Sequence, residues 1–212
     1  MMRRLAAALL LLLAGCAAAT AAEPRDATFA ISRYDSRIGT MTLDFRREGE
    51  TTVVETRLEV VVKVLFVTAY RYTQQRTETW SGDRLLSYEV RTDDNGTESR
   101  ASARLQGDRL VVAREAGPAT APTDAVPATF WNPVTVSRSV LIDVDDATPR
   151  KVAAVDQGVE TVEVGGRRIA ARRWKITGDL ERTIWYAAEG GDWVMLSFAA
   201  RDGSPITYER QP

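Results

Sequence analysis

The chain has 212 residues, with 28 Lys and Arg side chains against 29 Asp and Glu, and a formal net charge of −1. A charge balance this close to neutral gives no support for nucleic-acid binding. The chain has no histidine and a single cysteine, Cys16. This composition excludes His-based catalytic triads and zinc sites built on His or Cys. We therefore expect no catalytic residues, no metal and no cofactor, with a carboxylate-based hydrolase as the least favoured function.

The N-terminus has the layout of an export signal. Arg3 and Arg4 form a short basic start, and an apolar run follows up to Gly15. Residues 13–16 read Leu-Ala-Gly-Cys, which resembles the bacterial lipobox, where the cysteine thiol takes up a lipid and the signal is cut just before it. The pattern predicts a lipoprotein signal peptide over residues 1–15.

Lipidation would make the protein a membrane-anchored one. We expect the lipid on Cys16, a tether over residues 16–26 and a single domain over residues 27–212. Ala17, and not Asp, follows the cysteine, and by resemblance to the enteric sorting rules this favours the outer membrane, with the domain facing the periplasm. Two alternatives stay open. An ordinary signal cut nearer to Ala22 would give a soluble periplasmic protein, and an uncut apolar stretch would give a transmembrane anchor.

The body of the chain alternates polar and apolar residues with a period of two. Met41, Leu43 and Phe45 are apolar with polar residues between them, and similar runs recur between turn signals. Asn95-Gly96 and Gly165-Gly166 have the residue types of tight hairpins, where positive φ is required. The sequence predicts an all-β antiparallel meander of about a dozen strands, curled into a barrel or half-barrel.

One stretch interrupts this meander. Residues 117–133 contain four prolines and end in Phe130-Trp131-Asn132, while residues 134–142 suit a short helix or strand. Since proline cannot donate to a ladder, we expect a loop here. Either it is a crossover loop anchored by a buried Trp, or it is a lid in which Trp131 packs over the mouth of the curved sheet, near residues 193–198.

The run at residues 193–198, Trp-Val-Met-Leu-Ser-Phe, is apolar on both faces. A strand with one face in solvent should alternate, so we expect this strand to be covered on both sides. A roll with an inner cavity satisfies that requirement, and so does a roll filled by its own side chains.

A series of short motifs lies along the chain in a fixed order. The motifs are Tyr34…Ile38-Gly39-Thr40, Tyr70-Arg71-Tyr72, Glu78-Thr79-Trp80, Asn95-Gly96, Phe130-Trp131-Asn132, Trp185-Tyr186 and Asp202-Gly203-Ser204. This series resembles a bacterial family of exported β-rich proteins of unknown function. The resemblance implies a curved half-barrel similar to that of lipoprotein carriers, and it implies no activity.

These observations favour a non-enzymatic protein that holds an apolar or amphipathic ligand, such as a lipid, inside the curved sheet. The alternative is a structural or interaction module of the cell envelope with a filled core. An open cavity of several hundred cubic ångströms separates the first from the second. The expected partners are the membrane, through Cys16, and a hydrophobic ligand. The aromatic candidates for ligand contact are Tyr70, Tyr72, Phe130, Trp131, Trp185 and Trp193.

Overall fold

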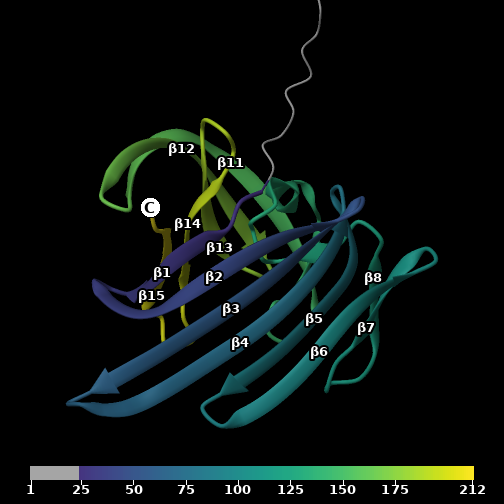
Figure 1. Cartoon of the computed structure of the whole chain (residues 1–212), viewed down its shortest axis with the longest axis horizontal. Coiled ribbons are helices and arrows are strands. Elements are labelled where there is room, and N and C mark those ends of the chain that lie inside the picture. The colour runs from purple at the N-terminus through teal and green to yellow at the C-terminus, as the bar shows by residue number, and fades with distance from the viewer. Residues whose placement is uncertain (1–23) are drawn as a thin grey trace, which may run out of the picture.

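The computed structural model describes residues 24–212, so the predicted signal peptide and Cys16 lie outside the described residues. The described part is all-β, with one 3-10 helix and no α-helix (Figure 1). None of its helices has the length and apolar character needed to span a bilayer. The elements are β1 (Ala27–Arg33), β2 (Ser36–Glu48), β3 (Thr51–Val64), β4 (Val67–Ser81), β5 (Arg84–Asp94), β6 (Thr97–Gln106), β7 (Arg109–Ala113), β8 (Ala119–Pro122), β9 (Val126–Pro127), η1 (Pro133–Ser137), β10 (Val140–Ile142), β11 (Pro149–Val164), β12 (Arg167–Gly178), β13 (Arg182–Ala187), β14 (Trp193–Ala199) and β15 (Pro205–Arg210).

The strands form one sheet whose centre is the pair of terminal strands. The spatial order is β8-β7-β6-β5-β4-β3-β2-β1-β15-β14-β13-β12-β11-β10-β9. Both halves are meanders of antiparallel strands, except that β9 pairs parallel with β10, and β1 pairs antiparallel with β15. The predicted all-β meander is therefore confirmed, with fifteen strands instead of about a dozen. The two edge strands, β8 and β9, are neighbours in sequence, so the chain must cross from one edge to the other between them.

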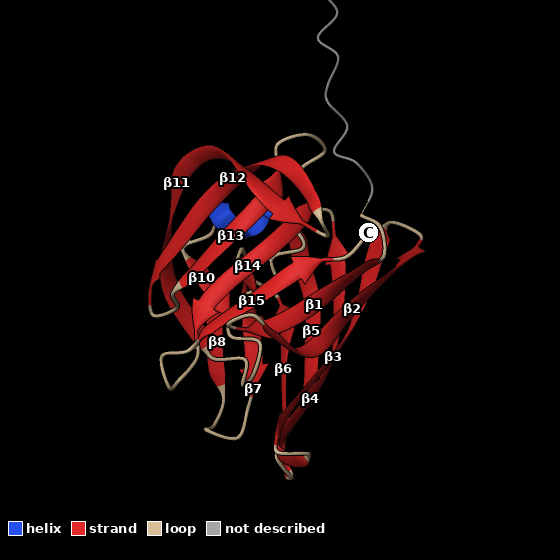
Figure 2. Ribbon diagram, turned by 90° about the vertical axis from the view of Figure 1, so that its left-hand side faces the viewer, coloured by secondary structure: helices blue, strands red, loops and turns tan. Residues whose placement is uncertain are grey.

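The sheet curls strongly, and its concave face carries the core. Figure 2 shows the strands wrapping around an interior, with the β11–β12 hairpin arching over β13 and β14. Alternation places every second side chain inside. A bulge in the β4–β5 pairing between Thr79 and Trp80 shifts this alternation. As a result Leu85 is fully buried whereas Leu86 is only partly buried.

The proline-rich segment crosses the concave side of the sheet. Residues 125–130 are all buried, and the carbonyl oxygen of Phe130 accepts a hydrogen bond from the Tyr186 hydroxyl at 2.9 Å. The expectation of a loop was wrong in part, because β8 and β9 lie within the segment as short edge strands. Edges are where a sheet tolerates proline. Beyond it lie both of the predicted elements, the helix η1 and the strand β10.

Hairpin turns differ in how well their residues suit them. Asn95 and Gly96 form the two-residue β5–β6 turn with φ of 54° and 93°, as predicted for this dipeptide. The β3–β4 turn has the same length and the same positive φ, but its residues are Leu65 and Phe66. Both of these side chains are exposed, at 87% and 101%. That hairpin ends at the far left tip of the sheet in Figure 1.

The strand β14 is covered on both faces, as its sequence predicts. On the concave side Trp193 and Leu196 belong to the main core. On the convex side Val194 packs in a second, smaller cluster with Val164, Ala171 and Trp185, which the arching β11–β12 hairpin helps to build.

Candidate ligand-binding cavity

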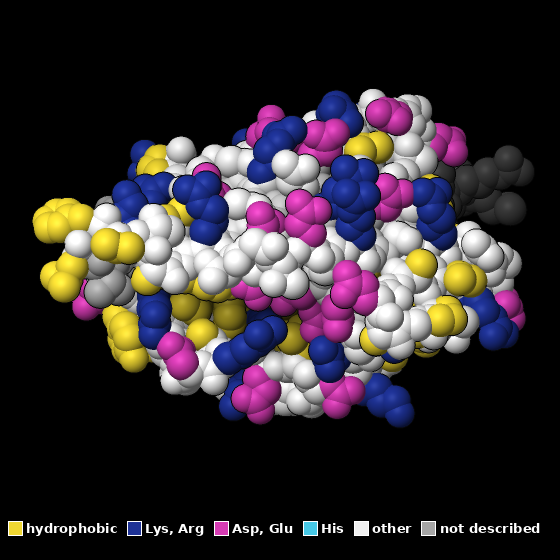
Figure 3. Space-filling model, turned by 90° about the horizontal axis from the view of Figure 1, so that it is seen from below, with side chains coloured by type: hydrophobic (Ala, Val, Ile, Leu, Met, Phe, Trp, Pro, Cys, Tyr) yellow, Lys and Arg dark blue, Asp and Glu magenta, His cyan; other side chains and the backbone are white. Residues whose placement is uncertain are grey.

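A large cavity occupies the concave side of the sheet beside the proline-rich segment of residues 117–133, which we call the crossover segment. Its volume is about 1320 Å³, and it opens to solvent along an edge where Ala69, Asn95 and Arg201 are exposed. Figure 3 shows this hollow from below, with hydrophobic side chains inside it and charged side chains along its edges. Its apolar wall includes Ile31, Met41, Leu58, Val60, Leu196 and Phe198.

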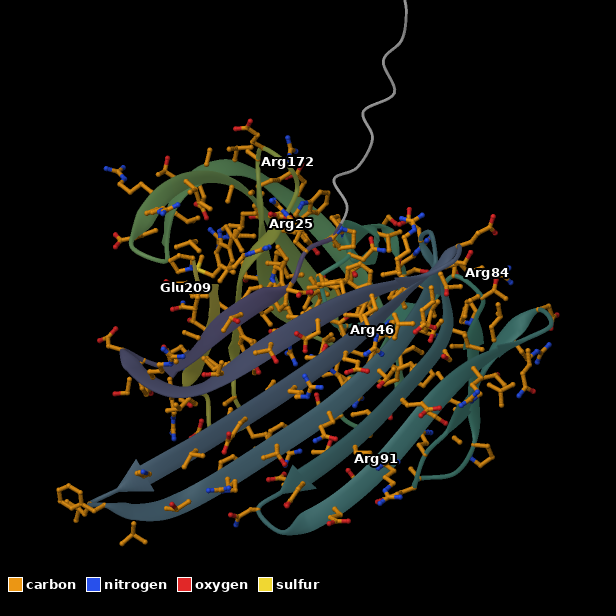
Figure 4. The ribbon with its side chains drawn as sticks, viewed as in Figure 1. Arg25, Arg46, Arg84, Arg91, Arg172 and Glu209 are labelled. Atoms are coloured by element: carbon orange, nitrogen blue, oxygen red, sulfur yellow. The ribbon has the colours of Figure 1, made fainter. Side chains whose placement is uncertain are left out.

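The most buried charged side chain on the wall is Arg76, in β4. It is 6% exposed, because its position alternates inward with Tyr72 and Trp80 along the strand. By contrast, Figure 4 labels Arg46 and Arg91, which are exposed to solvent. Arg76 is the one arginine among the described residues that is classed as buried.

Arg76 has few partners and all of them are neutral. Its Nη1 donates to Oε1 of Gln74 at 3.0 Å, and its Nη2 lies 3.4 Å from the sulfur of Met41. Its Nε is buried without a hydrogen-bond partner. No carboxylate oxygen within the described residues comes within 4.0 Å of it. A guanidinium has five N–H donors, so most of its donor capacity is unused.

Gln74 links Arg76 to an acidic group. Its amide nitrogen donates to Oδ1 of Asp145 at 3.0 Å and to Oγ1 of Thr92 at 3.1 Å. The Tyr72 hydroxyl donates to the same carboxylate oxygen at 2.7 Å. These bonds fix the orientation of the amide, whose oxygen must then face Arg76. Burial, and next the charge of Asp145, raise the pKa of Tyr72, so its hydroxyl stays protonated as a donor.

A second arginine lies on the wall from the other half of the sheet. Arg182, in β13, is partly buried, with its guanidinium carbon 4.3 Å from the centre of the Phe198 ring. Burial lowers its pKa, while Asp143 counteracts that effect. Between the two arginines Tyr208 faces the cavity. Burial raises the pKa of Tyr208 to about 12, and the positive charges of Arg76 and Arg182 both oppose this rise.

The other charged groups around the cavity are mostly satisfied within the protein. Arg33 pairs with Asp202 at 2.5 Å, and Arg150 pairs with Asp143 at 3.1 Å. Burial raises the pKa of Asp143. No cluster of three or more Asp, Glu, His or Cys in residues 24–212 is arranged to hold a metal ion.

Beyond the cavity, the interior is closed by a cluster around Glu78, two residues after Arg76 in β4. Its Oε2 accepts hydrogen bonds from the indole nitrogens of Trp80, at 2.9 Å, and Trp131, at 3.0 Å, and from the hydroxyl of Thr129, at 3.4 Å. Trp131 packs edge-on against Trp80 and Phe45, each ring 5.2 Å away. Burial raises the pKa of Glu78, while these hydrogen bonds and the positive charge of Arg76 act to lower it.

Four of the six aromatic residues predicted for ligand contact line the cavity, and two do not. Tyr70, Tyr72, Phe130 and Trp193 are on its wall. Trp131 does not line it, and the predicted position near residues 193–198 was wrong, because its ring partners are in β2 and β4. It is the preceding residue, Phe130, whose ring lies 6.3 Å from Trp193.

The last of the six, Trp185, faces the convex cluster. Its indole nitrogen donates to Oε1 of Glu160 at 2.7 Å, and the guanidinium of Arg173 lies over its ring. The reason is the alternation of β13, since Ile184 and Tyr186 on either side belong to the concave core. This placement removes Trp185 from the candidate ligand contacts.

Sequence reasoning missed the polar residues of the cavity, although the sequence carries a signal for some of them. In β4 the residues at even positions from 70 to 80 are Tyr, Tyr, Gln, Arg, Glu and Trp. If the aromatic ends of this series face inward, strict alternation places Gln74, Arg76 and Glu78 inside as well. No such signal marks Asp145 or Arg182, which reach the cavity from a turn and from a distant strand.

The comparisons with known proteins support the fold. The family model of DUF6134, a domain of unknown function, matches residues 29–211. The chain is similar in structure to a beta-barrel-like protein of the DUF1849 domain of unknown function from Brucella abortus. That similarity has a TM-score of 0.59 at 12% sequence identity and covers 87% of this chain and 94% of the other. No curated protein matches the chain.

Proposed function

We propose that this chain, which belongs to the DUF6134 family of unknown function, is a non-enzymatic protein that holds an amphipathic ligand in its cavity. The observation that carries the proposal is the open cavity of about 1320 Å³ with a mainly apolar wall. Typical small-molecule pockets measure roughly 300–1,000 Å³, so this one has room for a lipid-sized molecule.

The distribution of side chains supports the same function. Most of the wall is apolar, while polar groups gather around Gln74 and Arg76, as expected for a ligand with an apolar body and a polar end. A scaffold with no ligand would gain from filling such a space, since an unfilled apolar cavity costs stability. Beside the cavity, residues 125–130 are all buried and fill the neighbouring part of the interior.

An envelope location belongs to the proposal as well. Lipidation of Cys16 would tether the domain to a membrane, with the outer membrane favoured and the periplasm as its compartment. Radiolabelled palmitate should then mark the wild-type chain and not the Cys16→Ala variant, and equal labelling of the two would contradict this part.

Native mass spectrometry of the full chain, extracted from a bacterial membrane, tests the binding function. We expect a bound lipid-sized molecule in addition to the covalent anchor. The matched variant is Val60→Trp, which narrows the cavity from its wall, against Val159→Trp on the exposed surface. Loss of the extra mass in the first variant and not in the second supports the function. An empty wild-type chain that also fails to take up a hydrophobic dye contradicts it and favours the structural module.

A further inference from the structure

We propose that Arg76, with Arg182 across the cavity, binds the anionic headgroup of the ligand. This inference rests on the proposed function and adds the chemical class of the ligand, an amphiphile with a carboxylate or phosphate group. The apolar chain would lie along the wall formed by Met41, Leu58 and Val60.

The first argument is the state of Arg76. A buried charge is costly unless it is paired and hydrogen-bonded. Arg76 is 6% exposed, yet its two hydrogen bonds go to a neutral amide and a thioether. Its Nε is buried and has no partner, and the residue lines the cavity. An anion in the cavity would supply the missing acceptors, because the guanidinium fork suits carboxylate and phosphate oxygens.

Glu78, on the same face of β4, is an internal candidate for a counter-charge, but it lies outside the 4.0 Å limit of an ion pair with Arg76. Its Oε2 accepts bonds from two indoles and a hydroxyl, and its Oε1 is buried without a hydrogen-bond partner. It is also absent from the cavity wall. Asp145 is bound to Tyr72 and to the amide nitrogen of Gln74, so Gln74 separates its charge from the guanidinium.

The second argument is the position of Arg182. It belongs to the other half of the sheet but lines the same cavity. Within the described residues it forms no ion pair, and its one hydrogen bond goes to the backbone carbonyl of Glu181. Tyr208 lines the same cavity, and the charges of Arg76 and Arg182 both act on its hydroxyl. An anionic group beside Tyr208 would therefore be within the influence of both arginines.

The test compares probes that differ in the headgroup. The full chain, freed of exchangeable lipid on a hydrophobic resin, is titrated with dodecanoate, dodecyl phosphate and 1-dodecanol, which share one chain length, and with a short-chain phosphatidylglycerol. We expect the anionic probes to bind at least about tenfold more tightly than the alcohol, since hydrogen bonds to charged groups are strong. The ranking among the three anionic probes distinguishes a carboxylate from a phosphate and a free amphiphile from a phospholipid.

The variants assign the effect to a residue. Arg76→Met should remove most of the preference for the anionic probes over 1-dodecanol, and the preference that remains should be what Arg182 supplies. Arg91→Met, on the exposed face of the next strand, should change neither. If Arg76→Met does not fold, the carboxyl pKa of bound ¹³C-labelled dodecanoate in the wild type decides, because a nearby guanidinium must lower it.

The outcomes separate the two proposals. Equal affinities for dodecanoate and 1-dodecanol in the wild type would overturn the anion site while the binding function stands, and would indicate that Glu78 balances Arg76 through the protein. An equal loss of affinity for all four probes in a folded Arg76→Met chain would also overturn the anion site. Binding of no probe at all would contradict the binding function itself.

Discussion

Two buried charges, two residues apart on the same face of β4, have opposite surroundings. Glu78 is enclosed by the crossover segment, which places Thr129 and Trp131 on one of its oxygens. Arg76 faces a cavity of about 1320 Å³ and has no anionic partner within 4.0 Å among the described residues. We call these two regions the filled end, around Glu78, and the open end, around Arg76.

This contrast explains how one sheet can hold both a core and the proposed binding site. Its concave face is too wide for its own side chains to fill. Only residues 123–125 join β8 to β9, and the amide of Ala125 donates to the carbonyl of Pro122, so this connection is a short turn between the two edges. The buried residues 125–130 that follow the turn fill only part of the interior. The open end is what remains, so a mutation there should affect ligand binding more than stability, and the filled end should show the reverse.

The largest expected effect is at the filled end. Trp131→Ala removes a ring that packs on Trp80 and Phe45 and a donor to Glu78, so we expect a loss of about 3 kcal/mol in unfolding free energy. Urea unfolding measures it. Trp131→Phe keeps most of the packing and should lose only about 1–2 kcal/mol.

Ligand content should stay unchanged in the Trp131→Ala chain, because Trp131 does not line the cavity. A stable variant with altered ligand content would show that this tryptophan gates the open end after all. That result would mean that the filled end and the open end are energetically coupled.

Much of this contrast was within reach of the sequence, and some of it was not. Period-two alternation predicted the meander, and the mixed series in β4 contains Gln74, Arg76 and Glu78 at inward positions. The bulge between Thr79 and Trp80 follows no local signal, because it depends on the pairing with β5. The placement of Trp131 depends on long-range packing against β2 and β4, which neighbouring residues do not specify.

The next largest effect is a pH dependence at the filled end. Burial raises the pKa of Glu78 in the folded chain above its ordinary value, so folding favours the protonated carboxyl. Its contribution is fully present below the unfolded pKa, about 4.3, and is lost as pH rises toward the folded pKa. Between the unfolded and the folded pKa, the unfolding free energy of the wild type should fall by about 1.4 kcal/mol per pH unit relative to that of Glu78→Gln, which cannot ionise.

Thermal unfolding of both chains across a pH series measures this difference. Burial also raises the pKa of Asp143. Its contribution to the pH dependence is the same in both chains, so it cancels in the comparison. Glu98→Gln, an exposed carboxylate in β6, serves as the control and should follow the wild type. A Glu78→Gln chain that stays parallel to the wild type at every pH would mean that the indole donors keep Glu78 ionised.

At the open end, a substitution that removes the buried charge should increase stability, whereas Trp131→Ala at the filled end should decrease it. Without ligand, Arg76 is a buried cation with neutral hydrogen-bond partners, so Arg76→Met should raise the unfolding free energy by about 1 kcal/mol. Arg91→Met on the exposed face should stay within about 0.5 kcal/mol of the wild type. A loss of stability in ligand-free Arg76→Met would show that the charge is compensated inside the protein, and would remove the contrast between the two ends.

The smallest expected effect lies at the tip of the open end. Leu65 and Phe66 adopt positive φ in a two-residue turn, a conformation that costs most L-residues about 1–2 kcal/mol, while Asn-Gly is the preferred pair there. Replacing them with Asn and Gly relieves this strain, but the added glycine makes the unfolded chain more flexible and offsets part of the gain. We expect a net increase of about 0.5–1 kcal/mol. The control with Ser at both positions removes the same exposed apolar surface without the turn preference, so it should be close to neutral. If both variants lose stability, then Leu65 and Phe66 make contacts in solution that stabilise the fold. The tip of the open end would then contribute to the stability of the core, although both side chains are exposed.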